Sequence, residues 1–214
     1  FAQFCANASG IAKSRISILQ NLNPIHEYPM DYLLPIESSK FNILVLLDPI
    51  KASSDTRVFA SPLIGYQDQV NALRDLKTLI MDDRINLIIK THPGWPEQEI
   101  IGLADEQLIP FVCPSTTSLE NLLDTVDLVI GLNYHGAALI AAAQKELPII
   151  LHYVAPYEIF SKFENTYSRF LDLKLGKYTK NSIELHLACV SALEDTNFMN
   201  NLIQSSIEFS KNYL

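Results

Sequence analysis

An α/β fold, with a parallel sheet between two layers of helices, is what the sequence predicts. Strand-like and helix-like segments alternate five times between residues 41 and 153, with short connections. Parallel strands joined by right-handed crossover helices produce this alternation. The first strand-like segment, residues 41–48, is a continuous apolar run, which indicates a strand buried on both faces. These observations favour helices on both faces of the sheet.

The elements follow in a regular order. The segments expected to be strands are residues 41–48, 85–90, 108–113, 127–131 and 147–153. The segments expected to be helices between them are residues 66–83, 96–105, 115–126 and 133–146. In the first helix, Val70, Leu73 and Leu76 have helical spacing. In the third, a hydroxyl at Ser115 or Thr117 together with Glu120 predicts a capping box. The whole predicts a Rossmann-like, three-layer sheet.

The two ends of the chain have a different character from the middle. Residues 23–40 contain three prolines in 18 residues and are expected to form an extended connector. Residues 155–214 have the pattern of amphipathic helices. The expected organisation is therefore a leading segment and linker at 1–40, the sheet domain at 41–165, and C-terminal helices at 166–214 that pack back on that domain. The chain begins at Phe1 without a basic leader, and we expect it to be a fragment or processed form.

Composition limits the possible functions. Hydrophobic residues make up 48% of the chain and charged residues 19%, which is enough for a large core. The net charge of −8 argues against a general binder of nucleic acid or membrane surfaces. Three widely spaced cysteines without a CxxC pair indicate a reducing, cytoplasmic location and no zinc site. No apolar run is long enough to span a membrane, and no histidine cluster predicts a metal.

Ligands of such sheets bind at the carboxyl ends of the strands, so polar residues directly after strands are the candidates for a site. The candidates with the stronger case follow the second and fourth strands: Lys90, His92, Gly94, Asn133, Tyr134, His135, Gly136 and Ala137. Possible additional residues of the same cleft follow the first and third strands: Asp48, Arg57, Ser115, Thr116 and Ser118.

The two stronger turns have chemistry that suits a phosphate. The turn at 133–137 leads into a helix, whose N-terminus presents free N–H groups and the positive end of the helix dipole. Lys90 supplies a positive charge, and His92 supplies a hydrogen-bond donor. Ordinary alternatives remain open: an unremarkable strand-to-helix turn with close alanine packing, a surface lysine with a capping histidine, and a simple helix cap at 115–118.

Several familiar motifs are absent from the sequence. It contains no G-x-G-x-x-G, no Walker loop and no G-x-S-x-G. Their absence argues against a nicotinamide dehydrogenase, a P-loop enzyme and an α/β-hydrolase.

The segments "LIIKTHPG" and "VCPSTTSLENLLDTVDLVIGLNYHGAALIAAAQKELPIIL" resemble the C-terminal, nucleotide-sugar-binding domain of GT-B glycosyltransferases. The similarity is closest to bacterial capsule and lipopolysaccharide transferases with a K-x-H-P motif, which corresponds here to Lys90, His92 and Pro93. The resemblance implies that one GT-B half is present, that His92 contacts the donor phosphate, and that no cofactor or metal is needed. It also implies that residues 1–40 are the end of an N-terminal GT-B domain and the interdomain linker, and that the rest of that domain, which carries the acceptor site, is missing.

This sequence departs from the family at one motif. Many GT-B enzymes have E-A-x-x-x-G-x-P, in which the glutamate binds the donor ribose; here Ala141 stands at the glutamate and Glu146 at the glycine. The resemblance therefore implies no donor class. Three hypotheses follow: a glycosyltransferase domain for a nucleotide-activated sugar or polyol in surface polysaccharide synthesis, a GT-B-like nucleotide-sugar epimerase or hydrolase, and a non-catalytic GT-B-like module.

Overall fold

The computed structural model describes residues 36–47, 66–90, 112–113, 117–133, 136–154 and 174–213. All of them belong to one compact unit that spans residues 34–213. The domain boundaries expected at 40/41 and 165/166 stay predictions.

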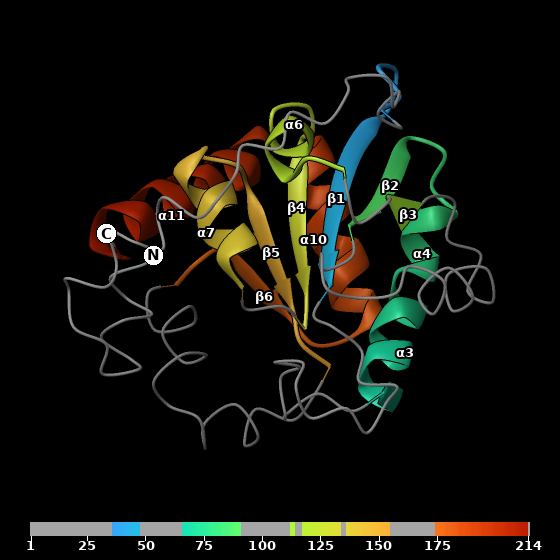
Figure 1. Cartoon of the computed structure of the whole chain (residues 1–214). Helices are drawn as coiled ribbons and strands as arrows, with labels where there is room; N and C mark the ends of the chain where they lie inside the picture. The colour runs from blue at the N-terminus through green and yellow to red at the C-terminus, as the bar shows by residue number, and fades with distance from the viewer. Residues whose placement is uncertain are drawn as a thin grey trace. The chain divides into compact units, whose positions relative to one another are not determined.

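A six-stranded sheet forms the centre of this unit (Figure 1). Its strands are β1 (Phe41–Leu47), β2 (Ile85–Lys90), β3 (Val112–Cys113), β4 (Leu128–Leu132), β5 (Ile149–His152) and β6 (Lys177–Thr179). Their order is β3-β2-β1-β4-β5-β6, and every neighbouring pair is parallel. The chain moves outward from β1 to β3, returns to β4, and moves outward again. The strand order therefore reverses between β1 and β4, which is where ligands bind in doubly wound sheets.

The pairing register places the carboxyl ends of the strands along one edge. Leu47 at the end of β1 pairs with Leu132 at the end of β4, and Leu132 pairs with His152 of β5. On the other side of β1, Lys90 ends β2 and pairs with Cys113. Residues that directly follow these strands therefore share this edge, which we call the carboxyl edge.

Helices cover both faces of the sheet, as the sequence predicts. The helices of one face are α3 (Tyr66–Asp75), α4 (Lys77–Ile80) and α10 (Ser182–Glu194). The helices of the other face are α6 (Leu119–Leu123) and α7 (Ala137–Gln144). The last helix, α11 (Thr196–Tyr213), contributes Leu202 to the core of the first face and Phe209 to the core of the second. The expected helical C-terminal part is thus present.

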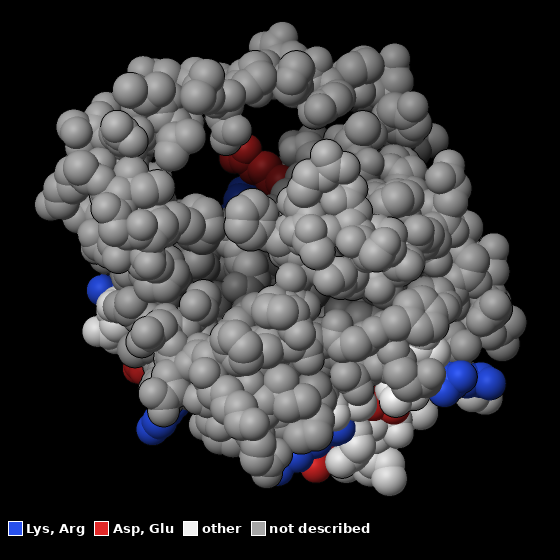
Figure 2. All heavy atoms as spheres, turned by 60° about the horizontal axis from the view of Figure 1, so that its bottom comes forward, with Lys and Arg blue, Asp and Glu red and all other residues white. Residues whose placement is uncertain are grey.

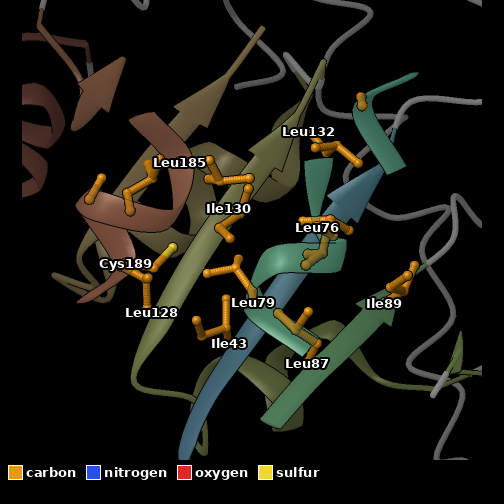
Figure 3. Close-up of a cluster of buried hydrophobic side chains, with 14 of the residues drawn as sticks. Ile43, Leu76, Leu79, Leu87, Ile89, Leu128, Ile130, Leu132, Leu185 and Cys189 are labelled. Atoms are coloured by element: carbon orange, nitrogen blue, oxygen red, sulfur yellow. The ribbon is translucent and has the colours of Figure 1, made fainter. Parts of the chain in front are cut away.

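The core consists of two apolar layers, one on each face of the sheet. Successive residues of β1 alternate between them: Ile43 and Val45 belong to the first layer, and Leu44 and Leu46 to the second. Figure 3 shows side chains of the first layer, which pack between the sheet and helices α4 and α10. Burying each such side chain stabilises the fold by about 1.5–3 kcal/mol relative to exposure. A central strand must supply both layers, which explains its continuous apolar sequence.

Buried asparagines connect the strands at the opposite edge of the sheet, where the strands begin. Asn42 accepts a hydrogen bond from Asn86 Nδ2 at 2.8 Å, and its own backbone N–H donates to Asp127 Oδ2 at 2.8 Å. The Asn42 side chain also donates to the carbonyl oxygens of Glu37 and Lys40. Because these bonds connect β1 with β2 and with the residue before β4, the cluster fixes the relative positions of the strand starts.

The sequence interpretation was wrong about one helix and missed one strand. The helix expected over 66–83 is two helices, α3 and α4, that meet at Leu76, where Leu76 and Leu79 make tighter i→i−3 hydrogen bonds. No glycine or proline marks this break. Strand β6 was not expected, since it has three residues. It follows Gly176 (φ 65°), where an added Cβ would lie 2.1 Å from the carbonyl oxygen of Ile149.

Candidate functional site

The carboxyl edge is the candidate site, and five of the predicted site residues are described there. These are Lys90, Ser118, Asn133, Gly136 and Ala137. The other predicted residues lie outside the described ranges and stay predictions: Asp48, Arg57, His92, Gly94, Ser115, Thr116, Tyr134 and His135.

Lys90 is the last residue of β2 and is buried, with 6% of its surface exposed. Its neighbour Ile89 belongs to the first apolar layer, so by the alternation of a strand the Lys90 side chain lies on the other face, that of α6 and α7. Its strand partner Cys113 belongs to the layer of that face. Burial raises the pKa of the Cys113 thiol to about 11, and the positive charge of Lys90 acts in the opposite direction.

The helix start predicted after the fourth strand is present. Helix α7 begins at Ala137, and Gly136 is its N-cap residue without a side-chain hydrogen bond to the first turn. By contrast, Ser118 caps α6 and Asn181 caps α10 through their side chains. The N-cap residue of α7 therefore supplies no side-chain cap to the first-turn N–H groups, and these groups carry the positive end of the helix dipole at the carboxyl edge.

Asn133 shapes the turn between β4 and α7. It is fully buried and has a left-handed backbone, with φ 47°. Its N–H donates to the carbonyl oxygen of His152 at 2.8 Å, and its Oδ1 accepts from the N–H of Val154 at 3.0 Å. Asparagine adopts this conformation more easily than most residues. These bonds make Asn133 a positioning residue of the turn.

Ser118 acts as a helix cap. Its Oγ accepts a hydrogen bond from the N–H of Asn121 at 3.3 Å, at the start of α6. The capping box predicted from Ser115 or Thr117 with Glu120 is therefore wrong in register, because the N-cap lies at Ser118 and the third helical residue is Asn121. The helix-cap alternative for the hydroxyl run is confirmed at this residue.

The chain departs from the family motif at Ala141 and Glu146, and the backbone conformation at Glu146 is the one that the motif's glycine favours. Glu146 has φ 58°, in the left-handed region that glycine favours. The N–H of Glu146 donates to Ala143 and that of Leu147 to Ala142, which is the Schellman arrangement at the end of α7. A left-handed residue is thus needed where the motif has glycine. Ala141 is half-buried and packs against the second apolar layer.

The sequence interpretation missed a buried cluster at the same edge. His152, the last residue of β5, lies between Asp75 of α3 and Thr179 of β6, with Nε2–Oδ2 at 3.0 Å and Nδ1–Oγ1 at 2.9 Å. The spacing of histidines and carboxylates in the sequence does not predict this cluster, because Asp75 is 77 residues away from His152. The position of His152 at a strand end, the same signal that selected Lys90, could have found it.

Charged side chains and possible metal ligands among the described residues bear on which ligands the domain can hold. In Figure 2, which brings the carboxyl edge forward, the described residues that are visible include both acidic and basic side chains. Within the described ranges, no group of three or more histidine, cysteine, aspartate or glutamate side chains could hold a metal ion. None of the described helices is both long enough and apolar enough to cross a bilayer.

No protein-family model and no curated protein sequence matches the chain. Solved structures do resemble it. One is the C-terminal domain of LpcC, a glycosyl transferase group 1 family protein from Francisella tularensis (TM-score 0.50, 10% identity, 80% of this chain and 85% of that chain). Another is the C-terminal CMP-Kdo binding domain of WaaA from Acinetobacter baumannii (TM-score 0.51, 11% identity, 80% of this chain and 90% of that chain).

A third similar structure is a putative UDP-N-acetylglucosamine 2-epimerase from Listeria monocytogenes (TM-score 0.53, 13% identity). The match covers 86% of this chain and 46% of that protein. The chain thus spans the length of single C-terminal domains and about half of this larger protein. Identities this low show the fold alone. The chain therefore has the α/β fold of the C-terminal domain of GT-B glycosyltransferases and of a related epimerase.

Proposed function

We propose that the chain is the nucleotide-sugar-binding domain of a GT-B glycosyltransferase that acts in bacterial surface polysaccharide synthesis. The donor, a nucleotide-activated sugar or polyol, binds at the carboxyl edge near the switch point between β1 and β4. One observation carries the proposal: Lys90 and the start of α7, whose N-cap residue is Gly136, lie at the same edge and on the same face of the sheet.

The spacing of the sheet suits a phosphate held between these two groups. Lys90 pairs with Leu46 of β1, and Leu46 pairs with Gly131 of β4, so two strand spacings separate β2 from the strand that leads into α7. That separation is about 10 Å between backbones. Across it, Lys90 supplies a full positive charge and the α7 N-terminus supplies N–H groups and a partial one. His92, two residues after Lys90, adds a donor in this proposal.

The chemistry that follows is stabilisation of a leaving group. When the glycosidic bond to the nucleotide breaks, negative charge grows on the departing phosphate oxygens. Lys90, His92 and the turn at 133–137 neutralise this charge, so that the bond breaks more easily. The acceptor site and the catalytic base belong to an N-terminal domain in this proposal, which agrees with the match to about half of the longer epimerase.

A nucleotide-sugar epimerase is the second candidate, because the Listeria protein resembles the chain as closely as the transferase domains do. Product analysis distinguishes them: a transferase gives nucleotide and glycoside, whereas an epimerase gives an altered sugar nucleotide and a hydrolase a free sugar. A non-catalytic module is the third candidate, and Ala141 favours it, because no carboxylate stands at the family's ribose-binding position.

Binding measurements test the proposal directly. The chain is titrated with CMP, CDP, UDP, GDP and their sugars, and melting temperature and affinity are recorded. We expect one nucleotide class to bind, and His92→Ala and Lys90→Met to weaken this binding by about ten- to a hundredfold, because a hydrogen bond to a charged group contributes about 1.5–3 kcal/mol. Lys40→Met is the matched control, since Lys40 directly precedes β1 at the opposite edge. No binding across the panel, or equal affinity of His92→Ala and wild type, would contradict the proposal.

A further inference from the structure

A polar cluster lies within the otherwise apolar layer between the sheet and α3. His152 is fully buried, and Ile150, which points to the same face of β5, belongs to the first apolar layer. Both ring nitrogens of His152 have a partner: Nε2 lies 3.0 Å from Asp75 Oδ2, and Nδ1 lies 2.9 Å from Thr179 Oγ1. Thr179 is fully buried, and the Asp75 side chain is 22% exposed.

The chemistry of the partners fixes the tautomer of the neutral ring. The Asp75 carboxylate can only accept, so Nε2 carries a hydrogen and donates to it. In neutral histidine Nδ1 is then an acceptor, and the Thr179 hydroxyl donates to it. All three side chains are satisfied in this arrangement. The assignment follows from the hydrogen-bond network.

The cluster connects parts of the fold on both sides of the switch point. Helix α3 belongs to the crossover between β1 and β2, whereas β5 and β6 lie beyond β4. Figure 1 shows α3 on the side of the sheet toward which the arrowheads of β4 and β5 point. Asp75, at the end of α3, is therefore bonded to His152 at the carboxyl edge, and the rest of the helix extends past that edge.

The cluster also reaches the turn that precedes α7. The carbonyl oxygen of His152 accepts from the N–H of Asn133, and the N–H of Val154, two residues later, donates to Asn133 Oδ1. The N–H of Tyr153 donates to the carbonyl oxygen of Thr179. Every residue from 152 to 154 is thus bonded either to the turn or to the cluster.

We propose that His152 is a positioning residue of the candidate donor site, held by Asp75 and Thr179. It fixes the end of β5, and through β5 it fixes the backbone of Asn133 and the entry into α7. The same contact with Asp75 holds α3 beside the carboxyl edge. The role in donor binding rests on the proposed function, whereas the positioning of Asn133 can be measured without a ligand.

The first experiment measures backbone amide hydrogen exchange by NMR on the full chain. We expect His152→Phe and Asp75→Leu to speed exchange at Asn133 and Val154 by about tenfold, as loss of a buried hydrogen bond predicts. Asp75→Asn should restore slow exchange, because its amide oxygen still accepts from Nε2–H. Rescue by this variant separates the hydrogen bond from a general loss of stability.

A matched pair of hydroxyl deletions provides the control and covers the case in which His152→Phe fails to fold. Thr179→Val removes a hydroxyl of the cluster, and Ser206→Ala removes an equally buried hydroxyl that donates to Leu147 before β5 at 2.6 Å. Thr179→Val should speed exchange at Asn133 and Val154, and Ser206→Ala should not. Equal effects of the two variants at these amides overturn the proposal.

The second experiment measures affinity for whichever of CMP, CDP, UDP and GDP the wild type binds. We expect Asp75→Leu and Thr179→Val to weaken it by about three- to tenfold, a size usual for residues that act through others, and Asp75→Asn and Ser206→Ala to leave it unchanged. Altered exchange with unaltered affinity overturns the role in donor binding. If the wild type binds none of the four, the proposed function fails, while the exchange experiment still decides whether His152 positions the turn.

Discussion

Oδ1 of Asn133 accepts a hydrogen bond from the N–H of Val154 at 3.0 Å, across the gap left where β4 and β5 have ended. A side chain therefore continues the pairing of two strands beyond their last ladder bond. The Asn133 backbone is left-handed there, with φ 47°, which turns the chain toward α7. Asn133 thus connects the ends of β4 and β5 and also sets the direction in which the chain enters the helix that begins at Ala137.

Substitutions of Asn133 should separate these two contributions. Asn133→Gly loses the acceptor for Val154 and should lower the free energy of unfolding by about 1–3 kcal/mol. Asn133→Ala loses the same acceptor and must also hold a left-handed backbone, which costs about 1–2 kcal/mol more. Urea unfolding of both variants measures the difference. An alanine variant as stable as the glycine variant would show that the backbone there has relaxed.

A substitution of Glu146, unlike those of Asn133, should stabilise the fold. It has φ 58° and closes α7 in a Schellman arrangement, where glycine is the usual residue. We expect Glu146→Gly to raise the free energy of unfolding by about 1 kcal/mol, because glycine has no Cβ to strain. Glu146→Ala serves as the control, since it removes the carboxylate and keeps the Cβ. Equal stabilisation by both would assign the gain to charge and not to the backbone.

The sheet could be predicted from the sequence because each of its main strands is an apolar run that both faces bury. Ile43 and Leu44 point to opposite faces of β1, and both are fully buried. Strand β6 could not be predicted, since Lys177 is exposed and Tyr178 half-buried, which leaves no apolar pattern. The break between α3 and α4 at Leu76 also has no sequence signal, because the apolar spacing continues through it.

The candidate site was predictable only where a local rule applied. The rule that ligand residues follow strands selected Lys90 and the turn into α7, and the structure places both at the carboxyl edge. Asp75 could not be found this way, because it lies on a helix and meets His152 only after the chain has folded. Asn133 was selected as a ligand residue, but its burial and its bond to Val154 give it a role in the turn.

An acid titration should reveal the ion pair between Asp82 and Arg84. The Arg84 guanidinium donates to both carboxylate oxygens, from Nε to Oδ1 at 2.9 Å and from Nη2 to Oδ2 at 2.6 Å. These hydrogen bonds lower the pKa of Asp82 from 3.8 to about 2. Because the pKa is depressed in the folded protein, the stabilisation is complete above pH 3.8 and is lost as the pH falls toward 2.

Unfolding free energies of wild type and Asp82→Asn between pH 2 and pH 6 measure this effect. The wild type should lose more stability than the variant between about pH 4 and pH 2, and the difference should shrink in about 0.5 M salt, which screens the pair. Parallel curves for the two proteins would show that Asp82 has the same pKa in the folded and unfolded states.

Thiol chemistry can report the charge of Lys90 next to Cys113. Burial raises the pKa of Cys113 to about 11, and the charge of Lys90 partly opposes this. At pH 8 we therefore expect iodoacetamide to label Cys113 far more slowly than an unfolded thiol, because the side chain is fully buried and little thiolate is present. Cys189 is an internal control, since burial raises its pKa without a contribution from Lys90 and it lies in the other apolar layer. Lys90→Met should slow labelling of Cys113 relative to Cys189, measured by mass spectrometry of peptides. An unchanged ratio would mean that the Lys90 ammonium is directed away from the thiol, and the face assigned to this side chain would then be wrong.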